Sequence, residues 1–199
     1  MENSKKNITF YKIVRILTVA PIICLITSLL LFFNNRSLYG STLSFILSLI
    51  FLVVVPLLSY PVFYIVKPFR LKGRPFQRKL AIVFSYCSYI FVVIFSLIFH
   101  DSLQIIFYHL NYFLTATLIF LSTKFLHFNA SGHAAGVAGP ITFLSLFVSP
   151  WYAFGYLLLI LVIYCSIKMK RHTILETIIG SLIPTIIGIV CFIIFICVM

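Results

Sequence analysis

The stretch Ile174–Val198 reads ILETIIGSLIPTIIGIVCFIIFICV and carries a single charged residue, Glu176, near its start. A helix needs about 20 apolar residues, within a range of about 17 to 25, to cross the hydrocarbon core of a bilayer. This stretch is long enough, and its apolar residues run continuously instead of alternating, which favours a helix over a barrel strand. It therefore predicts a membrane-spanning helix.

Six further apolar runs precede this one. They are Ile13–Phe33, Ser44–Val66, Leu80–Phe99, Leu103–Leu121, Ala134–Val148 and Tyr152–Ile167. Of the 199 residues, 62% are hydrophobic and 9% are charged, and a soluble domain of this size could not bury so much apolar surface. Because the fifth and sixth runs are short, we expect an all-α, polytopic membrane helical bundle with six or seven transmembrane helices. It forms a single domain over residues 1–199.

The basic residues are distributed unevenly along the chain. Fourteen of the fifteen Lys and Arg residues fall on one side of the expected bundle, and Arg36 falls on the other. Because cytoplasmic loops carry an excess of Lys and Arg, we expect the amino terminus and the basic loops in the cytoplasm, beside the plasma (cytoplasmic) membrane of a prokaryote. Basic clusters beside membranes attract anionic headgroups, so the expected partners are membrane lipids and not nucleic acid.

Three short stretches at the ends of apolar runs carry residues suited to binding phosphate. They are Lys67-Pro-Phe-Arg-Leu-Lys-Gly-Arg-Pro75, Ser131-Gly-His133 and His172-Thr-Ile-Leu-Glu176. Two apolar runs separate each stretch from the next, and an even number of crossings returns the chain to the same face of the membrane. We therefore expect the three stretches to meet at one surface.

The first stretch contains Lys67 and, seven residues later, Arg74. Arg offers a planar fork of donors and Lys a point charge, and a phosphate dianion needs several such donors. A partly helical loop would aim both side chains at one point. The alternative is a basic juxtamembrane segment that fixes topology and binds nothing specific.

The second stretch places Ser131 near the N-cap of a helix rich in small residues. Unpaired N–H groups and the positive end of the helix dipole face outward at such a terminus, which favours phosphate, and Gly132 permits a close approach to the backbone. His133 falls in the first turn and is suited to donating a proton to a leaving oxygen. The alternative is an ordinary helix cap with a small-residue helix contact.

The third stretch places His172 four residues before Glu176, so that both lie on one helical face and the carboxylate accepts a hydrogen bond from the imidazole. That bond sets the tautomer, and the second ring nitrogen then serves as a nucleophile or base. An ionisable residue beside a membrane span is a functional candidate. The alternative is an acid favoured by the helix dipole at the start of a helix.

The three stretches together resemble the motifs of the type 2 phosphatidic acid phosphatases, the membrane branch related to the vanadium haloperoxidases. The family pattern is Lys-x6-Arg-Pro, then Pro-Ser-Gly-His, then Ser-Arg-x5-His-x3-Asp. Here the first element is complete, and the second lacks its leading Pro, which Ala130 replaces. In the third element Glu176 stands for Asp and Cys165-Ser166 stands for Ser-Arg. The resemblance covers residues 60–190.

The resemblance implies a metal-independent lipid phosphatase without a cofactor. It assigns the nucleophile to His172, oriented by Glu176, and the general acid to His133. It implies that the phosphate oxygens are bound by Lys67, Arg74, Ser131 and Gly132. Ser166 carries no charge, so Lys168, Lys170 or Arg171 would replace the missing arginine. The substrate class is a lipid phosphomonoester or pyrophosphate: phosphatidic acid, phosphatidylglycerol phosphate or an isoprenyl pyrophosphate.

Two other functions fit parts of the sequence. A non-catalytic lipid-phosphate binder or transporter on the same scaffold would explain the missing arginine and the Glu for Asp exchange. An intramembrane serine protease would use Ser131 as nucleophile with His172 as base, but it leaves Lys67 and Arg74 without a role. Binding without turnover distinguishes the first alternative, and competition by phosphate against a serine-directed probe distinguishes the second.

Overall fold

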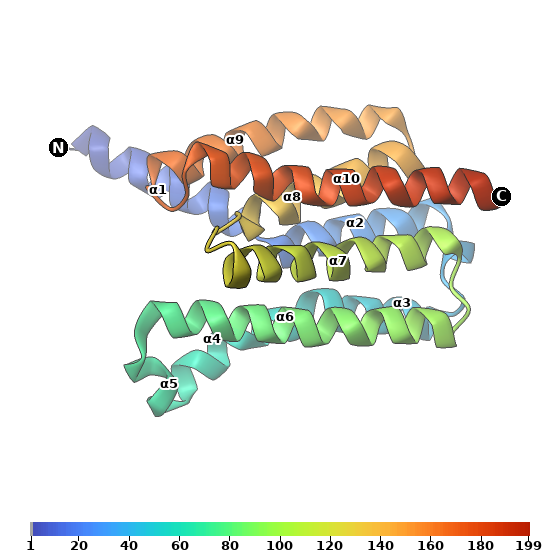
Figure 1. Ribbon diagram of the computed structural model, residues 1–199, viewed down its shortest axis with the longest axis horizontal. Helices are drawn as coiled ribbons and strands as arrows, with labels where there is room; N and C mark the ends of the chain where they lie inside the picture. Colours follow the sequence, from blue (N-terminus) through green and yellow to red (C-terminus); the bar gives the residue numbers. More distant parts are fainter. Residues whose placement is uncertain (1) are drawn as a thin grey trace.

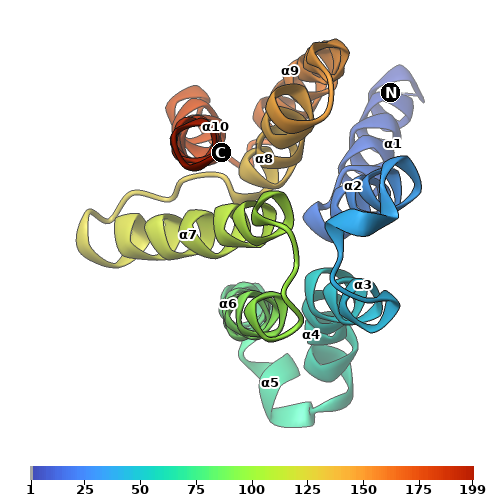
Figure 2. The same cartoon turned by 90° about the vertical axis from the view of Figure 1, so that its right-hand side faces the viewer.

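The computed structural model describes residues 2–199, except for the side chains of residues 2–8, 74, 75 and 78, and this part of the chain consists of helices joined by short irregular segments, without strands. The elements in order are α1 (Glu2–Leu17), α2 (Ala20–Asn34), η1 (Arg36–Leu38), α3 (Thr42–Leu49), η2 (Ile50–Val54), α4 (Val55–Ile65), α5 (Lys67–Leu71), α6 (Gly73–Ile98), α7 (Leu103–Phe125), α8 (Gly132–Phe147), η3 (Pro150–Gly155), α9 (Tyr156–Lys168) and α10 (Ile174–Val198). The long helices run along one common direction (Figure 1), and the view along that direction shows them grouped as a bundle (Figure 2).

Five helical segments of the described chain are long and apolar enough to cross a membrane. They are Thr42–Ile65, Lys79–Ile98, Leu103–Phe125, Pro150–Lys168 and Ile174–Val198. The pair Thr9–Leu17 and Ala20–Asn34, bent by 44°, gives a sixth if it crosses as one span. The expected helical membrane bundle is thus confirmed, but a count of seven is not, because α8 has 16 residues and spans only about 24 Å.

The first expected span, Ile13–Phe33, is broken in the structure, and Pro21 explains why. Proline cannot donate an N–H, and its ring clashes with the carbonyl four residues earlier, here that of Leu17. The helix α1 accordingly ends at Leu17, and Val19 takes an extended conformation with φ −63° and ψ 141° before α2 begins. Val19, in this bend, lines the cavity described below.

Helix α8 is short and is surrounded by other helices of the bundle. All residues from Ala134 to Leu144 are buried. A Cβ added to Gly136 would lie 2.4 Å from the Cβ of Ala20 in α2, and one added to Gly139 would lie 3.2 Å from the Cβ of Pro184 in α10. Small residues therefore let α2 and α10 approach α8 closely and fix its position in the centre of the bundle.

The basic loop between the second and third spans forms helices of its own. Val66 is extended (φ −82°, ψ 100°), and α5 starts afresh at Lys67 with Pro68 in its first turn. Gly73, with φ 70°, then reverses the chain into α6. Lys67 and Arg74 consequently belong to two different helices, and α5 projects from one edge of the bundle (Figures 1 and 2).

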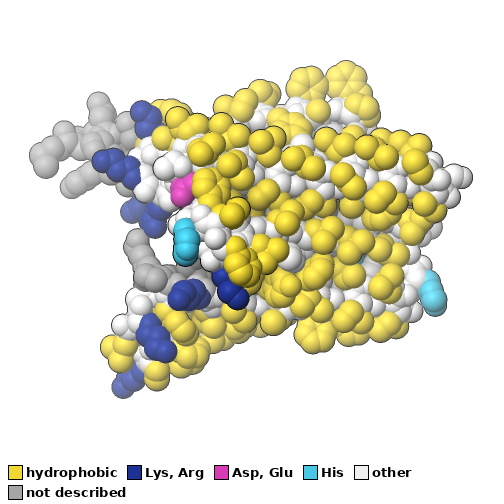
Figure 3. Space-filling view, viewed as in Figure 1, with side chains coloured by type: hydrophobic (Ala, Val, Ile, Leu, Met, Phe, Trp, Pro, Cys, Tyr) yellow, Lys and Arg dark blue, Asp and Glu magenta, His cyan; other side chains and the backbone are white. Residues whose placement is uncertain are grey.

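The two ends of the bundle differ in their charged side chains. Lys, Arg and Glu side chains gather at the end where the N-terminus lies, and hydrophobic side chains cover the long flank (Figure 3). At the opposite end Asp101 is buried and accepts hydrogen bonds from the N–H of Gly40 and the hydroxyls of Ser44 and Ser96, at 2.7 Å each. This carboxylate ties the two turns at that end together, so its role is structural.

Candidate functional site

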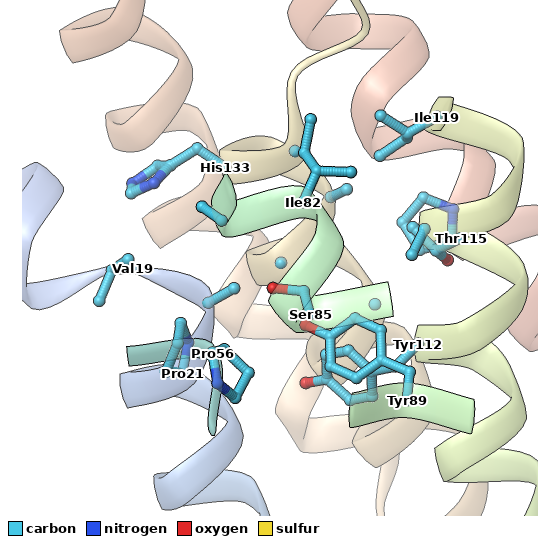
Figure 4. Close-up of a pocket in the computed structure, with 18 of the residues that line it drawn as sticks. Val19, Pro21, Pro56, Ile82, Ser85, Tyr89, Tyr112, Thr115, Ile119 and His133 are labelled. Atoms are coloured by element: carbon cyan, nitrogen blue, oxygen red, sulfur yellow. The ribbon is translucent and has the colours of Figure 1, made fainter. Parts of the chain in front are cut away.

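A cavity of about 440 Å³ opens inside the bundle and contains two of the expected site histidines. Figure 4 shows His133 at one side of it, near Val19, with the rings of Tyr89 and Tyr112 at the other end. The cationic and imidazole side chains on its wall are Arg15, His133, Arg171 and His172, and the apolar ones include Ile82, Ile119, Phe120 and Phe143. The cavity thus combines a basic part with an apolar part.

His133 lies in the first turn of α8, as predicted, and is held by Thr18 from the adjacent bend between α1 and α2. Its Nε2 lies 3.0 Å from the Thr18 hydroxyl oxygen. That hydroxyl already donates its proton to the carbonyl of Val14, at 2.7 Å, so it accepts a hydrogen bond from Nε2–H. Nδ1 is therefore the ring nitrogen that gains and loses a proton.

The surroundings of His133 favour its neutral form. Burial lowers the pKa of His133 to about 4, and the positive charges of Arg15 and of protonated His172 act in the same direction. An anion bound in the cavity would act in the opposite direction, because a nearby negative charge stabilises the imidazolium. His133 would thus become a proton donor when such a ligand arrives.

His172 and Glu176 make the predicted contact, with Nδ1 3.2 Å from the Glu176 Oε2. The contact does not lie along a helical face, because α10 starts at Ile174 and His172 precedes its N-cap, Thr173. The Glu176 carboxylate also accepts the Thr173 N–H at 2.8 Å, in a capping box. An ionised carboxylate only accepts, so Nδ1–H donates and Nε2 is the nitrogen suited to nucleophilic attack.

Ser131 caps α8, as predicted, but it does not line the cavity. Its hydroxyl accepts the Ala134 N–H at 3.3 Å, its own N–H donates to the Glu176 carbonyl at 2.9 Å, and its side chain is fully buried. The hydroxyl thus serves as the cap of α8 and the N–H joins the start of α8 to α10, and Ser131 is absent from the cavity wall on which a phosphate would bind. The same burial disfavours Ser131 as a protease nucleophile.

Gly132 lines the cavity beside His133. A Cβ placed there would meet no atom within 4 Å, so there is open space beside the first turn of α8. The N–H groups of a first turn have no partners within their own helix. The predicted approach of a ligand to the backbone at Gly132 is therefore sterically possible.

The first stretch does not join the other two at the cavity in the described part of the chain. Lys67 is exposed on α5 and is absent from the cavity wall, because α5 packs against α4 and α6 and projects away from the bundle. The side chain of Arg74 lies outside the described residues. The expected pairing of Lys67 with the two imidazoles is thus not seen.

Among the three residues expected to replace the missing arginine, only Arg171 lines the cavity. Lys168 is exposed, and its Nζ lies 5.5 Å from the centre of the Tyr164 ring. Lys170 is exposed in a turn with φ 52°.

The sequence reasoning missed Arg15. It treated this residue as a topology signal, yet Arg15 Nη1 donates to the Ser166 hydroxyl at 2.9 Å and lines the cavity. Ser166 occupies the position at which the resemblance expects an arginine. A usable signal was present in the sequence, because Arg15 lies inside the apolar run Ile13–Phe33, three residues before Thr18.

The arrangement suits an anion with several oxygens. Two arginines, two imidazoles and the amino end of α8 surround the basic part of the cavity, and the Glu176 carboxylate is engaged with His172. Among the side chains that the structure describes, no three His, Cys, Asp or Glu residues are grouped so as to hold a metal ion.

Comparison of the chain with protein-family models, with curated proteins and with solved structures finds no match.

Proposed function

We propose that the protein is an integral membrane phosphatase that removes a terminal phosphate from a lipid phosphate or lipid pyrophosphate. One observation supports the proposal above all. His172, oriented by a carboxylate, and His133, held by a hydroxyl, line the same cavity together with Arg15 and Arg171. A nucleophile and an acid on opposite sides of one anion are what phosphoryl transfer through a covalent intermediate requires.

In this proposal Nε2 of His172 attacks phosphorus in line with the bond to the leaving oxygen. The P–O bond breaks, and protonated His133 gives its Nδ1 proton to the departing lipid alkoxide or phosphate. The arginines neutralise the oxygens of a largely dissociative transition state. Neutral His133 then takes a proton from water, whose oxygen attacks the phosphohistidine, releasing phosphate and restoring both imidazoles. Glu176 stabilises the positive charge on His172 during the first step.

The lipid class is supported by the environment of the cavity. Its apolar wall, with Ile82, Ile119 and Phe120 from α6 and α7, is continuous with the basic part. Both helices belong to segments that are long and apolar enough to cross a membrane. A lipid chain would therefore remain among apolar residues while its headgroup reaches the imidazoles. The basic end of the bundle would face the cytoplasm under the positive-inside rule.

The test is phosphate release from a panel of lipid phosphates by the purified protein with excess chelator. We expect His172→Asn and His133→Asn to lower the rate by about 10²-fold or more. His127→Asn is the matched control, because His127 is exposed and absent from the cavity wall, and asparagine tolerates its φ of 51°. Full activity in both cavity variants would end the proposal.

A non-catalytic lipid-phosphate binder on the same scaffold is the second candidate. It is favoured by the exposed position of Lys67 away from the cavity, which leaves fewer cations around the anion than the resemblance implies. It predicts that the wild-type protein binds a lipid phosphate with no release of phosphate, and that His172→Asn binds it equally well.

A further inference from the structure

We propose that the guanidinium of Arg15 binds an oxygen of the phosphate group, so that the N-terminal helix completes the anion site. The inference rests on the function proposed above and adds to it a ligand from outside the three sequence stretches. It is argued from the position of Arg15, from the charge balance of the cavity and from the space beside α8.

Arg15 is held in place in the cavity wall. It lies in the last turn of α1 and is half-buried, and its Nη1 donates to the Ser166 hydroxyl at 2.9 Å. Ser166, in the last turn of α9, is only 1% exposed, so the contact fixes the guanidinium against a rigid partner. A guanidinium has five N–H donors, and one bond to Ser166 leaves donors to spare.

The charge of Arg15 is not balanced by an acid among the described side chains. The one ion pair found there joins His172 to Glu176, and the buried Asp101 lies at the other end of the bundle. Arg171 and His133 line the same cavity, and the charge of Arg15 disfavours a second positive charge on His133. Arg15 is half-buried, and a partly buried cation without a counter-ion is costly, which points to an anionic ligand beside it in the cavity.

The space for that ligand lies beside Gly132. The first turn of α8 is open there, and the α1–α2 bend brings Thr18 to His133 on the adjacent wall. Arg15 precedes Thr18 by three residues and therefore lies one helical turn away on the same side of α1. An anion at Gly132 would thus have both the guanidinium of Arg15 and the imidazole of His133 on the surrounding wall.

The test compares Arg15→Gln with Lys12→Gln, which removes an exposed charge from the same helix but does not alter the cavity wall. Orthovanadate, inorganic phosphate and a short-chain phosphatidic acid serve as probes, in calorimetric titrations of the detergent-purified protein. We expect Arg15→Gln to weaken binding of all three by about tenfold or more, the scale of a charge-assisted hydrogen bond. Lys12→Gln should bind like wild type, and Arg15→Lys should recover part of the affinity.

Ser166→Ala separates a lost ligand from a lost structural contact, because it removes the hydrogen bond and keeps the charge. We expect it to weaken binding by less than about threefold. Equal losses in Ser166→Ala and Arg15→Gln would overturn the inference in favour of a packing role. So would wild-type affinity in Arg15→Gln for all three probes.

The outcomes also separate this inference from the proposed function. Turnover of lipid phosphate by wild type and by Arg15→Gln at equal rates and affinities would leave the phosphatase standing and the role of Arg15 refuted. Binding of the probes that depends on Arg15, without any turnover by wild type, would support the anion site and refute the phosphatase. Loss of affinity for phosphatidic acid but not for the two inorganic anions would place Arg15 on the glycerol part of the headgroup and refute its role on phosphate.

Discussion

The Thr18 hydroxyl accepts a hydrogen bond from Nε2 of His133 across 3.0 Å and 115 residues of sequence. Thr18 lies in the bend between α1 and α2, and His133 lies in the first turn of α8. Since the hydroxyl donates to the Val14 carbonyl, it can only accept from the imidazole. The bend therefore sets both the orientation and the tautomer of the expected general acid.

Replacing Thr18 with valine removes that acceptor and keeps the volume. We expect kcat to fall by about tenfold or more while KM changes little, because His133 would lose its orientation and not its contact with the ligand. Thr18→Ser retains the hydroxyl and should remain near wild type. Measurement of kcat and KM on one lipid phosphate checks this, and equal activity of the serine and valine variants would contradict it.

Replacing Glu176 with glutamine tests the carboxylate apart from the helix cap. The amide oxygen can still accept the Thr173 N–H, so α10 should start as before. Because a neutral amide stabilises an imidazolium far less than a carboxylate does, we expect kcat to fall by about tenfold or more. Thermal unfolding should remain within a few degrees of wild type. A large drop in melting temperature with unchanged kcat would show that Glu176 acts only as a cap.

These two contacts differ in how far the sequence could predict them. The His172–Glu176 contact follows from a spacing of four, although the capping box, and not a continuous helix, brings the residues together. The Thr18–His133 contact depends on the break that Pro21 makes in an apolar run, and on which side of α8 the broken helix packs. The break could be predicted from Pro21, but the side of α8 on which the broken helix packs is set by tertiary structure and does not follow from local pattern.

The positions of the cationic residues were also difficult to predict from the sequence. A basic residue beside an apolar run is compatible with a topology signal or with a ligand, and it is the packing of α1 on α9 that places Arg15 in the cavity wall. The motif spacing of Lys67 and Arg74 suggested one shared site. The extended Val66 and the left-handed Gly73 instead put them on separate helices, and Lys67 faces outward.

The low pKa of His133 makes the stability of the ligand-free protein depend on pH. The folded protein holds this imidazole neutral down to about pH 4, whereas the unfolded chain takes up a proton near pH 6.5. The unfolded chain therefore binds a proton more readily than the folded protein below about pH 6.5. As a result, the free energy of unfolding is unaffected by this group above about pH 6.5 and decreases as the pH falls toward 4. We expect the melting temperature to fall between pH 7 and pH 5, and His133→Asn to reduce that fall. Identical pH profiles for the two proteins would contradict the burial of a neutral imidazole.

Two glycines near the amino end of α8 should respond in opposite ways to alanine. A Cβ on Gly180 would lie 2.5 Å from the Ser131 carbonyl oxygen and 2.7 Å from its nitrogen, so Gly180→Ala should destabilise the fold by about 1–3 kcal/mol. A Cβ on Gly132 meets nothing within 4 Å, so Gly132→Ala should keep the melting temperature but weaken orthovanadate binding. Melting curves and titrations of both variants check this pair. A destabilised Gly132→Ala or a fully stable Gly180→Ala would contradict it.

The most direct measurement is to trap the covalent intermediate. The protein is mixed with a ³²P-labelled lipid phosphate, quenched in alkali within milliseconds, and the labelled peptide is mapped by mass spectrometry. The account predicts an alkali-stable phosphoramidate on His172, absent from His172→Asn and retained in His127→Asn. Turnover of the lipid by a protein that carries its label on another residue, or turnover that persists in His172→Asn, would contradict it.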